Sequence, residues 1–183
     1  MTNDISGLSK PTAAARLVLS PGDPDYVPAD LRKLVERLTD FGLLGTRWKG
    51  HRFLVGKRFM QEIVFVGCSP FLRVDPRDDL DFCHIEIPEP TVEPLFYRGP
   101  QCGGPRCPEC RTPLGEALPD GFHCDVCNKS FSAHACLWRP GRTVHARFLI
   151  SIWNIHKGDA RPTEGLLQML ETFSGMPWKI GFL

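Results

Sequence analysis

Two pairs of cysteines in the middle of the chain have the spacing of metal ligands. Each pair has the form Cys-x-x-Cys and thirteen residues separate the pairs, which consist of Cys107, Cys110, Cys124 and Cys127. In structural sites, four thiolates bind Zn²⁺ as a closed tetrahedron with no position open to a substrate. The spacing therefore predicts one structural zinc ion as the cofactor of this protein, with these four cysteines as its ligands.

The residues between the two pairs predict a hairpin that would bring the pairs together. Pro119, Asp120 and Gly121 are typical of a turn, and Asn128 suits the left-handed backbone that a cysteine knuckle often needs. Residues 105–131 resemble a zinc ribbon, the rubredoxin-like module in which two knuckles share one zinc ion. The order of motifs along the chain is similar to that of small bacterial proteins of unassigned function with a central ribbon, a resemblance that implies no activity.

Other uses of the cysteines and of nearby histidines stay open. Two disulfides or a redox-active pair would also fit the spacing. Further side chains around the ribbon could replace a ligand or form a second site, and they are Cys102, His123, His134 and Cys136. The chain has eight cysteines but no basic-then-apolar export signal at its start, which favours a reducing compartment and metal binding. We therefore expect a cytoplasmic protein.

A second pattern resembles a catalytic zinc site. His84 and Glu86, followed by the first cysteine pair, are similar to the His-x-Glu and Pro-Cys-x-x-Cys elements of zinc deaminases. That resemblance implies a zinc ion on His84, Cys107 and Cys110, with Glu86 carrying a proton. The chain departs from the signature because an arginine separates the proline from the first cysteine. The second cysteine pair would also have no role.

Cys68 is the candidate nucleophile if the protein is an enzyme. It follows an apolar strand predicted over residues 62–67, which we expect in the middle of the sheet. If that strand pairs with the alternating strand 82–87, Cys68 would lie near Cys83 or His84, and the histidine could act as its base. The alternative is a buried structural thiol.

Residues 47–58 could bind nucleic acid. The stretch carries five cations and two aromatic rings, namely Arg47, Trp48, Lys49, Arg52, Phe53, Lys57 and Arg58. Such a mixture can grip phosphates and stack on bases. The alternative is a solvated hairpin whose rings pack into the core and whose cations pair with acids of the 75–81 loop. We favour the hairpin because 22 Lys and Arg nearly balance 21 Asp and Glu, which leaves no overall field toward phosphates.

Helices and strands must position these groups. Helical spacing predicts one helix over residues 31–41 after Asp30, and another between Thr163 as its N-cap and Gly175 as its end. Alternation predicts strands that include residues 15–19, 82–87, 144–155 and 178–182.

Together these elements predict an α+β fold in two layers, with two helices on one face of a mainly antiparallel sheet. A ferredoxin-like arrangement is the nearest named topology. The expected domains are a disordered N-terminus over residues 1–14, a core formed by 15–101 and 141–183, and an inserted zinc ribbon over 102–140.

The function expected from these observations is binding without catalysis. No apolar run reaches the length of a membrane span, and no phosphate-binding loop, serine-hydrolase or dinucleotide motif occurs. We therefore expect a non-enzymatic zinc-binding protein that acts as a protein–protein interaction or adaptor module. Its partner would be another protein, and no membrane association is expected. Nucleic-acid binding through 47–58 and a Cys68-dependent enzyme are the alternatives.

Overall fold

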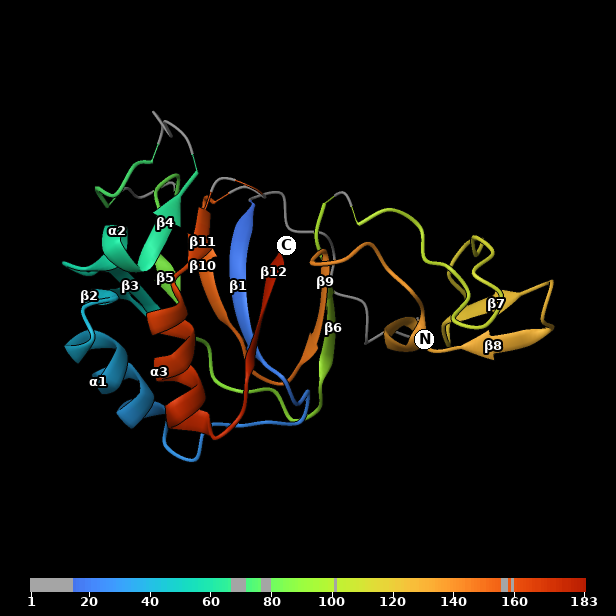
Figure 1. Ribbon diagram of the computed structural model, residues 1–183, viewed down its shortest axis with the longest axis horizontal. Coiled ribbons are helices and arrows are strands. Elements are labelled where there is room, and N and C mark those ends of the chain that lie inside the picture. The colour runs from blue at the N-terminus through green and yellow to red at the C-terminus, as the bar shows by residue number, and fades with distance from the viewer. Residues whose placement is uncertain (1–14, 67–71, 77–79, 101, 156–157, 159) are drawn as a thin grey trace, which may run out of the picture.

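A six-stranded antiparallel sheet forms the centre of the computed structural model (Figure 1), which describes residues 15–66, 72–76, 80–100, 102–155, 158 and 160–183. The strand order is β12-β1-β10-β5-β3-β2. These strands are β1 (Arg16–Pro21), β2 (Leu44–Lys49), β3 (Arg52–Val55), β5 (Ile85–Glu86), β10 (Ile150–Trp153) and β12 (Trp178–Phe182). The N-terminal segment 1–14, predicted to be disordered, and Cys68 both lie outside the described residues.

Two helices pack on one face of this sheet, as predicted. The first, α1 (Leu31–Asp40), begins at Asp30, whose carboxylate accepts a hydrogen bond from the Lys33 amide at 3.0 Å. The second, α3 (Glu164–Ser174), begins after Thr163, whose hydroxyl accepts from the Leu166 amide, and ends at Gly175 in the left-handed conformation. Their apolar faces join the sheet in the main core, which includes Leu17, Leu19, Leu34, Leu38, Ile150, Ile152, Leu166 and Leu170.

Short elements surround the central sheet. The helix α2 (Phe59–Glu62) leads into β4 (Ile63–Phe65), and β4 pairs with β11 (Ala160–Pro162). A second pair consists of β6 (Leu95–Arg98) and β9 (Thr143–Ala146). Between these two strands the chain forms a third pair, β7 (Phe122–Cys124) with β8 (Lys129–Phe131), followed by a turn of 3₁₀ helix η1 (Ala133–Ala135).

The β6–β9 pair covers part of the sheet face that the helices leave open. Val18 points away from the main core into a smaller cluster with Val144, Ala146, Leu149 and Leu183. Gly181 permits this close approach, because a Cβ atom there would lie 2.9 Å from the Val144 side chain. The sheet is therefore packed on both faces near β1, whereas the sequence predicted layers on one face only.

Two predicted strands are wrong in their extent or position. The apolar run 62–67 does not lie mid-sheet, since β4 belongs to the two-stranded β4–β11 sheet and Val64 is 50% exposed. The predicted strand 144–155 is divided between β9 and β10, which belong to different sheets. Phe148 and Leu149 lie between the two and are both buried, so the alternation of one continuous strand is broken there.

The remaining architecture agrees with an α+β fold built around a mainly antiparallel sheet. The ferredoxin-like topology stays a prediction. In the part of the chain that the structure describes, no helix combines the length and the apolar character needed to cross a membrane.

Candidate metal centre

Two tight loops hold the four cysteines; hydrogen bonds fix the shape of the first, and a left-handed residue shapes the second. In the first, the Cys107 amide donates to the Thr112 carbonyl at 2.9 Å and the Arg111 amide donates to the Cys107 carbonyl at 3.0 Å. In the second, Asn128 follows the last cysteine with φ 51°, which confirms the predicted left-handed residue.

The turn between the loops also forms where the sequence predicts it. Leu118 and Gly121 exchange two backbone hydrogen bonds, at 2.7 and 3.1 Å. Gly121 has φ 134°, and a Cβ atom there would lie 2.1 Å from the Phe131 carbonyl oxygen. Only glycine fits here, where the backbone just before β7 passes close to the end of β8.

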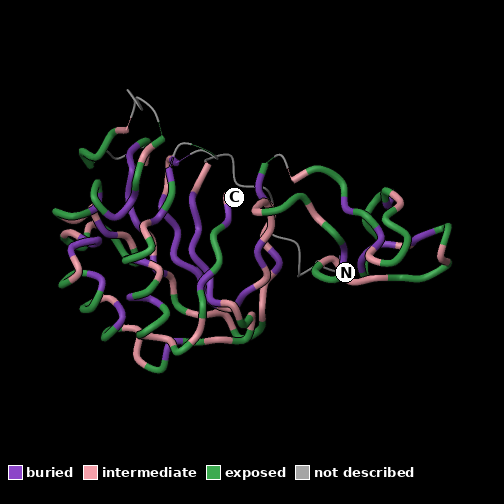
Figure 2. The backbone as a smooth tube through the Cα atoms, viewed as in Figure 1, coloured by how far each residue is buried: buried purple, intermediate pink, exposed green. Residues whose placement is uncertain are grey.

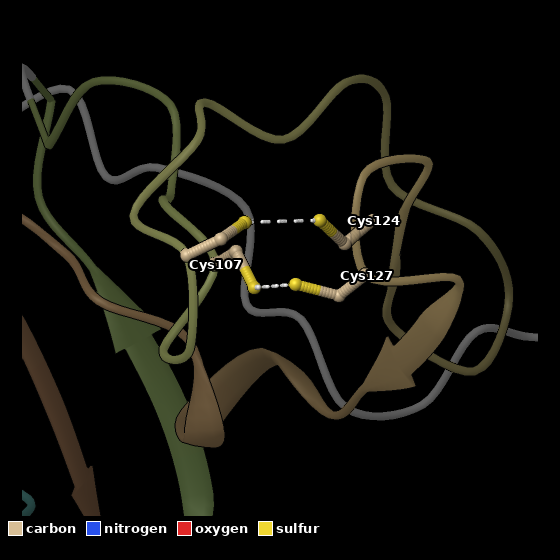
Figure 3. Close-up of side chains that lie close together, drawn as sticks. Cys107, Cys124 and Cys127 are labelled. Carbon is tan, nitrogen blue, oxygen red and sulfur yellow. Dashed lines mark hydrogen bonds between the residues drawn. The ribbon is translucent and has the colours of Figure 1, made fainter.

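The four sulfurs converge between the two loops, as Figure 3 shows for Cys107, Cys124 and Cys127. The Cys107 and Cys127 sulfurs are 3.9 Å apart, the Cys110 and Cys124 sulfurs are 3.5 Å apart, and all four lie within 4.8 Å of one another. A zinc–sulfur distance of about 2.3 Å gives a tetrahedron with edges of roughly 3.8 Å. The cluster therefore has dimensions compatible with a zinc ion.

The electrostatics of the cluster favour a bound cation. Hydrogen bonds with the Thr112 hydroxyl and backbone lower the pKa of Cys110 to about 6. The hydrogen bond with Cys110, together with burial, raises the pKa of Cys127 to about 12. Sulfurs this close cannot all ionise unless a positive charge lies among them. Cys107 and Cys124 are buried and Cys110 is exposed, so the cluster is open to water on one side. Residues 102–140, which carry the four cysteines, are called the ribbon for short.

An ion pair joins the two halves of this region. The Lys129 ammonium on β8 lies 2.7 and 2.9 Å from the two carboxylate oxygens of Glu109 in the first loop. Both side chains are exposed, so the pair contributes little to stability. It does hold the first loop beside the hairpin that carries the second cysteine pair.

The other thiols and histidines near the ribbon do not join the sulfur cluster. Cys136 is buried, with its sulfur 3.4 Å from the Ser132 carbonyl oxygen. His123 contacts the Ser130 hydroxyl, and His134 contacts the Ser132 hydroxyl. Among the described residues, the group of potential metal ligands consists of the four predicted cysteines. The seven described cysteines are all free, which gives the disulfide alternative no support.

The deaminase-like set is not assembled. Glu86 lies on β5 and His84 directly precedes that strand, so both belong to the central sheet rather than to the ribbon (Figure 1). The His84 ring is stacked on Trp153, with centroids 6.0 Å apart and planes 14° apart. Glu86 accepts hydrogen bonds from the Trp153 indole at 2.8 Å and from Arg52 at 3.2 Å.

These polar residues are part of a row of stacked side chains that the sequence did not reveal. The Arg16 guanidinium lies 4.7 Å from the Trp153 ring centroid, and β10 lies between β1 and β5. Trp153 is therefore enclosed between Arg16 and His84, and its ring faces are not available to stack on bases. In β10, alternation along the strand places Trp153 on the opposite face from the buried Ile150 and Ile152. This pattern in the sequence could have indicated the row.

The neighbours expected for the candidate nucleophile Cys68 are not arranged as a catalytic pair among the described residues. Cys83 is buried, and burial raises the pKa of its thiol to about 12, so it stays protonated and packed in the core. The β5 strand pairs with β10 and β3, and β4 pairs with β11. The pairing of 62–67 with 82–87 that would have placed Cys68 near His84 is not formed among the described residues, and Cys68, the candidate nucleophile, lies outside them.

Residues 47–58 form the hairpin given as the alternative to nucleic-acid binding. Strands β2 and β3 pair across the turn at residues 50–51, Phe53 is buried and Trp48 is half-buried. Arg52 pairs with Glu86 and Arg58 pairs with Glu62. Both of these acids lie outside the 75–81 loop, whose Asp78 and Asp79 are not among the described residues, so neutralisation by that loop stays a prediction.

Aromatic contacts connect the ribbon to the core. The Trp138 ring lies 5.7 Å from Phe122 in the ribbon and 5.4 Å from Phe96 on β6. Its indole N–H donates to the Ala133 carbonyl at 2.7 Å. Beside it, the imidazoles of His134 and His145 stack with centroids 4.4 Å apart and planes 5° apart. The ribbon is thus attached through a small set of rings.

Comparison with known proteins identified no relative of this chain. The chain matches no protein-family model, and it shows no significant similarity to a curated protein or to a solved structure.

Proposed function

We propose that this chain is a non-enzymatic zinc-binding protein that acts as a protein–protein interaction or adaptor module. The observation that carries the proposal is the convergence of four cysteine sulfurs within 4.8 Å, in a segment that stands away from the central sheet (Figure 1). We infer that residues 102–140 form a zinc ribbon inserted in the α+β core, with Cys107, Cys110, Cys124 and Cys127 as the ligands.

A closed four-thiolate site supports binding rather than catalysis. When bound, zinc would offset part of the negative charge of the four thiolates and connect the two loops, with no coordination position left for a substrate. The protein residues then present the surface of the ribbon in a fixed shape. Among the described residues, the potential metal ligands of the ribbon form one group, the four cysteines, and this group would be fully used in holding the ion.

The composition of the ribbon surface favours a protein partner. Its four basic residues equal its four acidic residues in number, and they are Arg106, Arg111, Lys129 and Arg139 against Glu109, Glu116, Asp120 and Asp125. A balanced charge gives no attraction to a phosphate backbone. The ribbon also exposes apolar side chains, with Leu118 at 50% and Val126 at 69%. Apolar groups on a polar surface are suited to the centre of a protein interface.

The experiment compares wild type with two matched variants in a quantitative pull-down from native extract, after zinc loading has been checked by elemental analysis. Val126→Glu places a negative charge on the exposed surface of the ribbon. Val92→Glu is the matched control and places the same charge on the surface of the rest of the protein, where Val92 is 88% exposed. We expect a partner that wild type and Val92→Glu retain and Val126→Glu loses. Equal capture by all three proteins, or a wild type without zinc, would contradict the proposal.

A further inference from the structure

A cavity of about 370 Å³ lies between α1 and the β2–β3 hairpin, far from the sulfur cluster in the fold. Its floor is apolar and consists of Leu31, Val35, Phe53 and Ile87. Phe53 and Ile87 belong to the main core, and Leu31 and Val35 pack against it. The floor is therefore held in place by the main core. The volume of the cavity falls in the range of small-molecule sites.

The rim of the cavity is charged, with more positive than negative groups. It carries Arg32 from α1, Arg47 from β2, His51 from the hairpin turn and Glu89 from the segment after β5. The Arg47 guanidinium stands 5.5 Å from the centroid of the Phe53 ring, so its charge is held above the apolar floor.

Arg32 is also free to contribute to a site. Its nearest ion pair is with Glu36 at 3.8 Å, and both side chains are largely exposed. An exposed i,i+4 pair of this length restrains the guanidinium weakly. Two guanidinium groups therefore face one carboxylate around the mouth of the cavity.

This cavity gives a role to the first part of the basic stretch 47–58. Arg47, His51 and Phe53 line the cavity. Arg58 instead pairs with Glu62 on α2 and covers the Phe41 ring at 4.8 Å. The stretch is divided between two places, and its cations do not act as one continuous patch.

We propose that this cavity binds a small amphiphilic carboxylate. The hydrocarbon part lies on the apolar floor, where burial is favourable. The carboxylate lies at the rim, where the planar guanidinium of Arg47 can donate two parallel hydrogen bonds to it. Glu89 repels a second negative charge, which makes a monoanion a better ligand than a phosphate dianion. This activity is separate from the protein interaction proposed for the ribbon.

The test uses the full zinc-loaded chain and four eight-carbon probes that differ in the head group: octanoate, 1-octanol, octylammonium and octyl phosphate. Binding is measured by amide chemical-shift changes around Phe53 and Ile87. We expect octanoate to bind most tightly. Arg47→Gln should weaken its binding about tenfold, the effect of losing one charge-assisted contact. Lys57→Gln is the matched control from the same stretch and should bind octanoate as wild type does.

A space-filling variant separates the cavity from surface attraction. Val35→Trp keeps every charge on the rim but fills the floor from a half-buried helix position, so octanoate binding should be lost. The proposal is overturned if octanol binds as tightly as octanoate, or if Arg47→Gln has no effect. Octanoate binding that survives Val35→Trp would overturn it equally, because the ligand would then lie elsewhere.

Discussion

The core and the ribbon differ in the number of residues that they bury, since buried residues are scarce in the ribbon (Figure 2). They also differ in the kind of side chain that is buried. The main core consists mostly of aliphatic and aromatic side chains from the sheet, α1 and α3. Of the five buried residues in the ribbon cluster, three are cysteines: Cys107, Cys124 and Cys136. A segment this short buries too little apolar surface to stay folded without a metal or another cross-link. The core therefore depends on apolar burial, and the ribbon depends on its sulfurs.

The largest effect is expected from removing one thiolate, which tests whether the ribbon depends on its sulfurs while the core does not. Cys124→Ser should abolish tight zinc binding and unfold the ribbon, because structural zinc supplies on the order of 10 kcal/mol to small zinc-dependent folds. The core should remain, since Leu17, Ile150 and Leu170 do not touch the cluster. Elemental analysis together with amide hydrogen exchange checks both halves. A core that loses its protected amides along with the zinc would show that the two regions fold as one.

The reciprocal change acts on the core. Leu38→Ala removes a fully buried side chain of α1 from the main core. We expect it to lower the free energy of unfolding by about 2–5 kcal/mol, the cost of lost burial plus a cavity. Urea unfolding measures the change, and zinc content should stay at the wild-type value below the transition. Lys33→Ala on the same helix is the control and should unfold close to wild type.

Replacing residues 102–140 with a short Gly-Ser linker tests the attachment itself. The core should fold cooperatively without the ribbon, because β6 and β9 still pair from Leu95 to Arg98. The main loss is the contact between Trp138 and Phe96, which we expect to cost roughly 1 kcal/mol. Thermal unfolding followed by circular dichroism checks this. Absence of a cooperative transition would mean that the ribbon belongs to the core.

The smallest effect concerns the stacked histidines at the same junction. Burial lowers the pKa of His145, His134 lowers it further, and Asp25 and the Pro94 carbonyl act in the opposite direction. Since the neutral form is favoured in the folded protein, its contribution to stability is present above pH 6.5, the ordinary histidine value. That contribution is lost as the pH falls from 6.5 toward the lowered pKa. NMR titration should show His145 titrating below its ordinary value, and His134→Ala should raise its pKa. No change in that variant would disprove the coupling.

Features set by neighbouring residues could be predicted from the sequence. Asp30, Thr163 and Gly175 act on backbone groups within a few residues, so the limits of α1 and α3 follow from local chemistry. The convergence of the four cysteines was predictable for a related reason. Each pair needs one tight loop, and Gly121 and Asn128 supply the conformations that bring the loops together.

Features set by distant partners could not be predicted in this way. Val64 faces Arg161 across the β4–β11 pair, and an apolar run such as 62–67 does not reveal which strand it will meet. The interruption between β9 and β10 was missed because both parts alternate correctly when taken alone. The cavity could not be predicted from the sequence either, because Val35, Arg47 and Glu89 come together only once α1, β2 and the segment after β5 have packed.

The pairing of β6 with β9 also determines how a mechanical load on the ribbon would reach the rest of the protein. The chain leaves for the ribbon after Arg98 and returns at Thr143, and these two residues face each other at one end of the ladder. A partner that pulls on the ribbon would therefore open the ladder from that end, one residue pair after another toward Leu95 and Ala146. Paired strands that open one residue pair at a time separate at a lower force than strands that must slide past one another. The pull would first load the bond from the Gly99 amide to the Arg142 carbonyl and the bond from the Phe182 amide to the Gly141 carbonyl, so it would reach β12, an edge strand of the central sheet, at the same point.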